Sequence, residues 1–279
     1  MTKLQPQPGR VLFAPLIWRL AMKIEQVPWA EMSESTADAV YMLRSAQRLF
    51  KQDIHCVSFD TWLEAEAAGM KIERDDLGLP TVRPAPLSDP PSVDHVLSAE
   101  PVARVVEVLR RLAQESGAGI VPVAAMTAGA TLQKRFGGDE PASAERIGYI
   151  REILLGLTRL YCEAGAGALL LLDEDPAGEA APLSDYASLF NLAEYFATPV
   201  FLLSRGAARP AAADAANSFG AKYLASDAVP DGVAALPSGE GIFDPGESWI
   251  AMSRWEVDPD TDPNVVQGWR ERLAQTDAR

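Results

Sequence analysis

A single carboxylate, Asp60, stands directly after a short apolar run, where it could act on a substrate. The run at 54–59 predicts a buried strand, and residues 62–68 predict a helix that is closed by Gly69. A β/α barrel positions its active-site residues in this way, between the end of a strand and the helix that follows. Asp60 is therefore a candidate acid/base, or a group that stabilises positive charge in a substrate. The alternative is that Asp60 only caps the helix, since Asp is favoured at that position.

Positively charged residues follow two other predicted strands. Arg19 and Lys23 come at and after the end of the run 11–18, and Arg205 comes after the run 200–204. Positive groups at the carboxyl end of a barrel strand suit an anionic ligand. The alternative for the first two is a solvated helix start, with Lys23 paired to a neighbouring acid.

Further charged residues fall at the same predicted edge. They are Arg135, Arg254 and the carboxylate Asp173. Cations gathered opposite Asp60 and Asp173, within an acidic protein, predict a pocket for a carboxylate or phosphate. The cations could instead form structural salt bridges with Asp173, Glu174 and Glu256, and the residues alone do not separate the two interpretations.

The order of the predicted elements indicates the fold. Eight apolar runs predict strands, at 11–18, 54–59, 120–126, 169–173, 200–204, 222–226, 232–236 and 249–253. Helical periodicity occurs at 36–50, 102–114, 143–163, 186–196 and 264–273. Strands that alternate with helices predict a parallel sheet, and eight of them predict a closed (β/α)8 TIM barrel. The last β/α units are abbreviated, because no helix fits between 236 and 249.

Composition sets the remaining expectations. A chain of 279 residues, 48% hydrophobic and 23% charged, predicts one barrel domain over 1–279. The net charge of -14 disfavours nucleic acid and anionic membranes as partners. No signal-like or membrane-spanning run occurs, so we expect a cytoplasmic protein. Residues 78–95 contain five prolines and predict a loop that covers the barrel opening.

Five segments resemble the uroporphyrinogen decarboxylase superfamily. They are VSFDTWLEAEAAGM (57–70), WRLAMK (18–23), MTAGATLQKRFGG (126–138), PVFLLSRG (199–206) and IAMSRWEVDPDTDPNV (250–265). The superfamily holds the decarboxylase itself and methyltransferases that move methyl groups between corrinoid proteins and thiols. The last segment, through its EV-x-PDT-x-P core, is nearest the methyltransferase branch.

The resemblance implies roles for individual residues. Asp60 matches the residue at the reacting centre of the decarboxylase, and Arg19 and Lys23 match two cations that hold substrate carboxylates. Arg135 stands where the decarboxylase has its active-site tyrosine. Substitution of Lys for Arg at position 23 loses the bidentate fork, so this match is partial.

The zinc ligands of the methyltransferase branch are not retained. On the family register, Leu203, Arg205 and Trp255 occupy the ligand positions, and none of them can bind zinc. His55 and Cys56 are adjacent on a strand, so their side chains point to opposite faces. We therefore expect a metal-independent protein without a cofactor of its own.

Three functions follow from these expectations. The first is decarboxylase-type chemistry on a small anionic, carboxylated aromatic substrate, with Asp60, Arg19 and Lys23 as catalytic residues. Residues that would bind this substrate are Arg205, Arg135, Asp173, Trp255 and Arg254. The second function is a component of a methyltransferase or O-demethylase that uses a corrinoid carried by a partner protein. The third is a non-catalytic ligand-binding subunit of a larger complex; a homodimer is also open.

Overall fold

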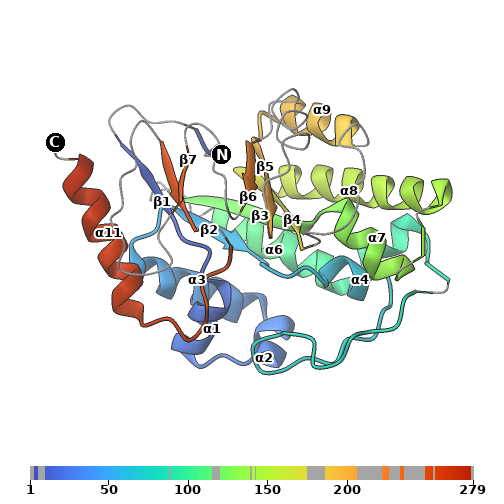
Figure 1. Cartoon of the computed structure of the whole chain (residues 1–279), viewed down its shortest axis with the longest axis horizontal. Helices are drawn as coiled ribbons and strands as arrows, with labels where there is room; N and C mark the ends of the chain where they lie inside the picture. Colours follow the sequence, from blue (N-terminus) through green and yellow to red (C-terminus); the bar gives the residue numbers. More distant parts are fainter. Residues whose placement is uncertain are drawn as a thin grey trace.

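Eight parallel strands form the centre of the structure, and helices lie outside them (Figure 1). The computed structural model describes residues 3–5, 10–87, 89–114, 120–138, 140–141, 143–174, 186–205, 222–225, 233–235, 249–253 and 255–277. The strands are β1 (Leu12–Ala14), β2 (Ile54–Val57), β3 (Val121–Thr127), β4 (Ala168–Asp173), β5 (Val200–Ser204), β6 (Lys222–Ala225), β7 (Val233–Ala235) and β8 (Ile250–Met252).

The strands pair in two sheets whose combined order is that of a barrel. One sheet has the order β2-β3-β4-β5-β6 and the other the order β1-β8-β7, and every pair is parallel. The backbone N–H of Asp53 donates to the carbonyl of Phe13 at 2.8 Å, which joins β1 to the start of β2. The sequential order and parallel direction identify a (β/α)8 barrel, as the alternation of elements predicts.

The strand sequences explain their central position. Every residue of β3 and β4 is buried, and β4 carries four consecutive leucines, Leu169–Leu172. A strand that is apolar on both faces is buried on both faces, which is typical of parallel sheets covered by helices.

Ten helices are defined in the described part of the chain. They are α1 (Trp18–Glu25), α2 (Trp29–Glu34), α3 (Thr36–Phe50), α4 (Leu63–Ala67), α5 (Val93–Ser98), α6 (Glu100–Gln114), α7 (Gly129–Gly137), α8 (Ala144–Ala164), α9 (Ala187–Tyr195) and α11 (Pro263–Asp277). Two of the longest begin at a serine cap: the Ser35 hydroxyl accepts from Asp38 N at 3.2 Å, and the Ser143 hydroxyl accepts from Arg146 N at 3.2 Å. Helix α8 ends at Gly165, which has a φ of 102°.

The first predicted strand is too long. The strand covers only Leu12–Ala14, and Trp18 begins a helix instead of ending a strand. The run 11–18 is apolar throughout because both elements are buried, and an apolar run alone does not separate a strand from a buried helix start. His95, expected in the loop, lies in the first turn of α5.

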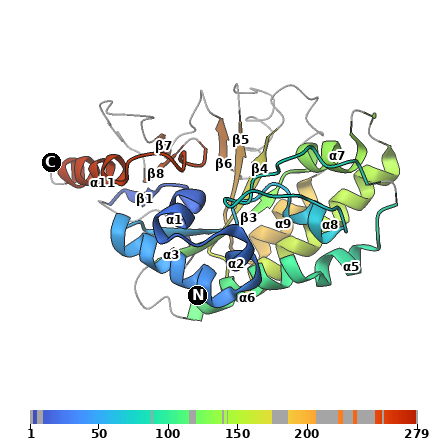
Figure 2. The same ribbon diagram turned by 90° about the horizontal axis from the view of Figure 1, so that it is seen from below.

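The proline-rich segment at 78–95 and the residue before it contact helices that follow different strands. The Arg19 side chain donates from Nε to the carbonyl of Leu77 at 3.1 Å, and Gly78 packs against the indole of Trp29. Further along, Pro86 lies beside Gly138 at the end of α7. The segment therefore runs from α1 and α2, which follow β1, to α7, which follows β3 (Figure 2).

The last helix of the chain lies on the outside of the barrel. Helix α11 packs against α3, on the side of the molecule where β1 lies (Figure 1). The abbreviated units fall at 226–232 and 236–248, which lie outside the described residues. Within the described ranges, no helix is both long and apolar enough to cross a membrane.

Candidate active site

Asp60 lies at the carboxyl end of β2, on a sharply turned backbone. Ser58, two residues earlier, has a φ of 60°, which is uncommon for a residue other than glycine. The backbone N–H of Asp60 donates to the Ser58 carbonyl at 2.8 Å, and Asp60 Oδ1 accepts from Trp62 N at 3.0 Å. The carboxylate therefore accepts from the backbone just before α4, but Trp62 occupies the cap position, so the prediction that Asp60 is the helix cap is wrong.

The Asp60 carboxylate is paired with a buried arginine. Arg74 Nη2 lies 2.9 Å from Asp60 Oδ2, and Arg74 Nη1 lies 3.3 Å from Oδ1. The same guanidinium donates to Glu66 Oε2 at 2.8 Å and to the Gly78 carbonyl at 2.6 Å. Burial lowers the pKa of Arg74, but Asp60 and Glu66 outweigh burial and raise the pKa overall. The three side chains together carry one net negative charge.

The Arg19 side chain is bound to the carboxylate of Glu256, which lies in the segment 250–265 after β8. Its Nη1 donates to Glu256 Oε2, and its backbone N–H donates to Glu256 Oε1 at 2.7 Å. Both side chains are buried. Burial raises the pKa of Glu256 to about 7, although Arg19 lowers it, and the charge of Asp60 raises it further. Arg19 therefore joins the start of α1 to the segment after β8, and its guanidinium is already engaged by a carboxylate.

Lys23 forms a pair of a different kind. Its ammonium contacts Asp260, and both side chains are substantially exposed, at 50% and 80%. The expected partner, an acid next to Lys23 in sequence such as Glu25, is therefore wrong: Asp260 lies 237 positions away, beyond β8. An exposed pair of this type contributes little to stability.

A second group of charges gathers at the carboxyl ends of β3, β4 and β5. Thr131, Lys134, Arg135, Glu174 and Arg205 line one cavity of about 230 Å³. Three of the five are cations, in a protein of net charge -14. The structure thus brings Arg135 and Arg205 together, two residues that are 70 positions apart in the sequence.

Arg135 is held in place by an aromatic ring and a carboxylate. The centre of its guanidinium lies 3.4 Å from the centroid of the Trp62 ring, and Nη2 contacts Glu174. Its Nε is buried and, among the described residues, has no hydrogen-bond partner. Burial lowers the pKa of Arg135, while Glu174 and Asp60 raise it. Asp60 is thus close enough to influence both Arg135 and the Arg19–Glu256 pair.

Asp173 supports this cavity from the end of β4. The Thr131 hydroxyl donates to Asp173 Oδ1 at 3.0 Å and accepts from Glu174 N at 2.8 Å. The Asp173 carbonyl accepts from Arg205 N at 2.8 Å. Asp173 therefore fixes the backbone and Thr131, and its side chain is buried.

Trp255 lies between an aromatic ring and a cation. Its ring meets Phe59 edge to face, with centroids 5.3 Å apart, and the Arg205 guanidinium lies 6.0 Å from the Trp255 centroid. Trp255 therefore connects the end of β2 to the end of β5. The remaining predicted cation, Arg254, lies outside the described residues.

The side chains of His55, Cys56 and Cys162 are buried. Within the described ranges, no three His, Cys, Asp or Glu side chains lie close enough together to hold a metal ion. Burial raises the pKa of both Cys56 and Cys162, and it lowers the pKa of His55 to about 4. Among the described residues, the groups that could act on a substrate are the charged side chains of the cavity and the carboxylates near it.

Sequence reasoning missed Arg74. It lies in the polar segment KIERDD, where one arginine among acids resembles an ordinary exposed stretch. No spacing rule connects position 74 to position 60. Thr131 and Trp62 were also not assigned to the site, although both fall within segments that the sequence singles out.

Comparisons with known proteins give a likeness of fold. No protein-family model matches this chain. No curated protein sequence matches it either. A solved structure described as a methyltransferase from Methanosarcina mazei is similar at a TM-score of 0.66 and 12% identity, covering 98% of this chain and 94% of that one. A 2,3-dimethylmalate lyase of the PEP mutase/isocitrate lyase superfamily is similar at a TM-score of 0.42 and 11% identity, covering 98% and 89%, and this likeness is too weak to support an argument.

Proposed function

We propose that this protein is a barrel enzyme that acts on a small, anionic, carboxylated aromatic substrate, with chemistry of the decarboxylase type. One observation carries the proposal: Lys134, Arg135 and Arg205 line a single cavity at the carboxyl ends of β3 to β5. This end of a β/α barrel is where its enzymes place their active sites. Distant membership of the uroporphyrinogen decarboxylase superfamily is part of the proposal.

Charge favours an anionic ligand in this cavity. Among the described residues that line it, the one carboxylate is Glu174, which is already bonded to Arg135. Lys134 and Arg205 add two positive charges. Guanidinium groups bind carboxylates through paired hydrogen bonds, so an acidic group of the substrate would lie between Arg135 and Arg205.

Aromatic side chains beside the cavity favour a planar ligand. Trp62 lies under Arg135, and Trp255 lies near Arg205 and against Phe59. Offset or edge-to-face contacts with these rings would orient an aromatic substrate. The two cations would thus hold its acidic group while the rings hold its plane.

Decarboxylation constrains which acidic group the cations can hold. A proton first adds to the ring carbon that bears the leaving carboxylate, which makes the ring cationic; the carbon–carbon bond then breaks, its electron pair restores the neutral ring, and CO2 departs. An arginine bound to the leaving carboxylate would stabilise the ground state more than the transition state. The cations would therefore bind a second acidic group, and the net negative charge of Asp60, Arg74 and Glu66 would favour a protonated, cationic ring.

Binding and turnover test this proposal separately. Calorimetry with benzoate and isophthalate should show saturable binding, and Arg205→Gln or Arg135→Gln should weaken it about tenfold, as expected for loss of a charged hydrogen bond. Arg111→Gln is the matched control, because Arg111 pairs with Glu107 on α6. Equal weakening in the control, or no binding by the unaltered protein, would contradict an anion site.

Turnover is measured as CO2 release from aromatic dicarboxylates. Asp60→Asn should lose turnover while retaining anion binding, because Asp60 lies outside the cation-lined cavity. Anion binding by the unaltered protein without release of CO2 would instead support a non-catalytic ligand-binding subunit.

Methyl transfer is the second candidate. It is supported by the fold likeness to the Methanosarcina mazei methyltransferase over 98% of this chain, and by the closing motif at 256–263. A corrinoid that copurifies with the protein, or methylation of added reduced cobalamin, would favour this candidate over decarboxylation.

A further inference from the structure

The described residues that line the cation-lined cavity come from three parts of the chain. Thr131, Lys134 and Arg135 belong to α7, Glu174 follows β4, and Arg205 follows β5. Positions 134 and 135 are three and four residues after position 131, so the three side chains share one face of α7. The distance between the α7 cations and Arg205 therefore depends on how this face is held against the ends of β4 and β5.

Hydrogen bonds at two points hold the start of α7 against β4. The backbone N–H of Ala128 donates to the Leu172 carbonyl at 2.8 Å, which fixes where the helix begins. The Thr131 hydroxyl donates to Asp173 Oδ1 at 3.0 Å and accepts from Glu174 N at 2.8 Å. Because this second contact comes from a side chain on the cavity face, about one turn into the helix, it fixes the orientation of that face.

The two residues that Thr131 holds are themselves bonded to the two arginines. The Glu174 carboxylate contacts Arg135 Nη2, and the Asp173 carbonyl accepts from Arg205 N at 2.8 Å. The Thr131 side chain is part of this network and is only 2% exposed. One buried hydroxyl therefore connects the contacts of both arginines, which come from different elements of the barrel.

We propose that Thr131 is a positioning residue of the anion site: its hydroxyl sets the spacing at which Arg135 and Arg205 both reach one acidic group. This inference rests on the proposed function, because it assigns a role within the cavity that binds the anion. A hydroxyl has one proton to donate, and Thr131 donates it to Asp173, so the hydroxyl acts through its protein partners and not on the ligand. Without it, the face of α7 turns, and an acidic group reaches one arginine at a time.

Two substitutions at position 131 separate the hydroxyl from the rest of the side chain. Thr131→Val keeps the shape and removes the hydroxyl, whereas Thr131→Ser keeps the hydroxyl. In calorimetry on the full chain, Thr131→Val should weaken benzoate binding about fivefold to tenfold, as expected when one of two charged hydrogen-bond partners is lost. Thr131→Ser should restore the affinity of the unaltered protein.

A double-mutant cycle tests whether Thr131 acts through Arg135. Arg135→Gln alone should weaken benzoate binding about tenfold. In the Thr131→Val background the same change should add less than about twofold, because the contact with Arg135 is already lost. The ligand then stays with Arg205, since Arg135 is bonded to Glu174. A general loss of structure at position 131 would leave the effect of Arg135→Gln unchanged, so additive effects would overturn the inference.

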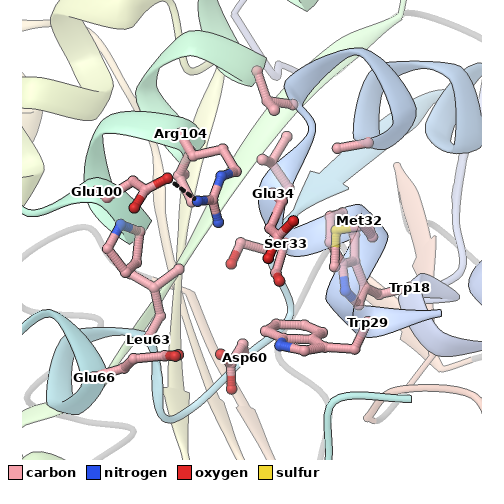
Figure 3. Close-up of a pocket in the computed structure, with 16 residues that line it drawn as sticks. Trp18, Trp29, Met32, Ser33, Glu34, Asp60, Leu63, Glu66, Glu100 and Arg104 are labelled. Atoms are coloured by element: carbon pink, nitrogen blue, oxygen red, sulfur yellow. Dashed lines mark hydrogen bonds and ion pairs between the residues drawn. The ribbon is translucent and has the colours of Figure 1, made fainter. Parts of the chain in front are cut away.

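Two controls test for a general loss of stability and for binding elsewhere. Thr158→Val removes another buried hydroxyl, which donates to the Leu154 carbonyl at 2.8 Å within α8. Arg104→Gln removes a cation from a separate cavity of about 400 Å³ beside α2, where Arg104 Nη2 donates to Glu100 at 2.8 Å (Figure 3). The two cavities share none of their described lining residues. Neither control should change benzoate binding.

The outcomes separate this inference from the proposed function. No benzoate binding by the unaltered protein, or weaker binding by Arg104→Gln, would overturn the anion site and this inference with it. The positioning role alone is overturned if Thr131→Val binds benzoate normally, if Thr131→Ser fails to restore binding, or if Thr158→Val weakens binding equally. Should Thr131→Val not fold, Thr131→Ala takes its place, since it leaves room for a water molecule beside Asp173. If neither variant folds, the hydroxyl is needed for folding and the positioning role is wrong.

Discussion

The guanidinium of Arg74 binds the carboxylate of Asp60 through two contacts, at 2.9 and 3.3 Å, and both side chains are buried. This pair changes the interpretation of Asp60, which the sequence presents as a lone acid at a strand end. The carboxylate is compensated by a cation from the segment that precedes the proline-rich loop. Asp60 therefore holds that segment against α4 in addition to any effect on a substrate.

Removal of Arg74 should destabilise the fold strongly. Arg74→Met leaves the buried Asp60 charge without its partner, a change that costs about 3–5 kcal/mol in buried pairs. Urea denaturation should show this loss near neutral pH. Asp60→Asn combined with Arg74→Met should cost less than the sum of the single changes; additive costs would contradict a direct pair.

A buried glutamate predicts how stability depends on pH. Glu64 is fully buried on α4 and accepts from Thr127 N at 3.0 Å and from the Thr127 hydroxyl. Burial raises its pKa to about 7, and the charge of Asp60 adds to this, while the bonds to Thr127 lower it. The folded protein thus binds this proton more tightly than the unfolded chain. Its contribution to stability is complete at low pH and is lost as pH rises from about 4.5 to about 7.

Glu64→Gln should remove that dependence. The difference in unfolding free energy between the variant and the unaltered protein should shift in favour of the variant by about 3 kcal/mol between acid and mildly alkaline pH. Some dependence in the same direction should remain, because burial also raises the pKa of Glu256 to about 7. Denaturation curves at a series of pH values measure this. Parallel pH profiles for the two proteins would show that Glu64 ionises normally.

Two ion pairs formed by α1 should differ in their effect on stability. Glu256→Gln leaves Arg19 buried without a charged partner and should cost about 3 kcal/mol or more. Lys23→Gln removes an exposed pair with Asp260 and should cost less than about 1 kcal/mol. Thermal or urea unfolding of both variants gives the comparison. Similar costs for the two changes would contradict the buried placement of Arg19.

The proline-rich loop depends on a glycine. Gly78 has a φ of 79°, and a Cβ there would lie 2.1 Å from a ring carbon of Trp29. Gly78→Ala should therefore displace the loop and the Trp29 ring, with faster proteolysis at the loop and a loss of stability of more than about 1 kcal/mol. Gly69→Ala is the control, since its φ is also positive but no atom lies within 4 Å of the added carbon. Equal effects would assign the loss to backbone strain alone.

The sequence predicted the barrel because each strand and helix carries its own pattern. The helix over 36–50 and the strand over 200–204 have the bounds that the apolar spacing predicts. The first strand was predicted too long, since a buried helix start is as apolar as a strand. The amino-acid pattern records burial, and burial alone does not define the backbone conformation.

Side-chain partners were much less predictable. The sequence singled out Asp60, Arg19, Lys23, Arg135 and Arg205, and the structure gives the first four of them carboxylate or guanidinium partners. The partner of Asp60 is 14 positions away and those of Arg19 and Lys23 are 237 positions away. No local spacing rule links residues so far apart, because the closing of the barrel brings them together.

By itself, the sequence determined an α/β chain with parallel strands and an acid at the end of the second one. These features follow from local periodicity, which any segment carries regardless of its neighbours. The tertiary structure alone decided that Asp60 is paired with Arg74, that Arg19 is bound by Glu256, and that Arg135 and Arg205 share a cavity. Charge compensation is a property of distances in space: Arg19 meets Glu256 only because β1 pairs with β8, and Arg135 meets Arg205 because β3, β4 and β5 lie side by side in one sheet.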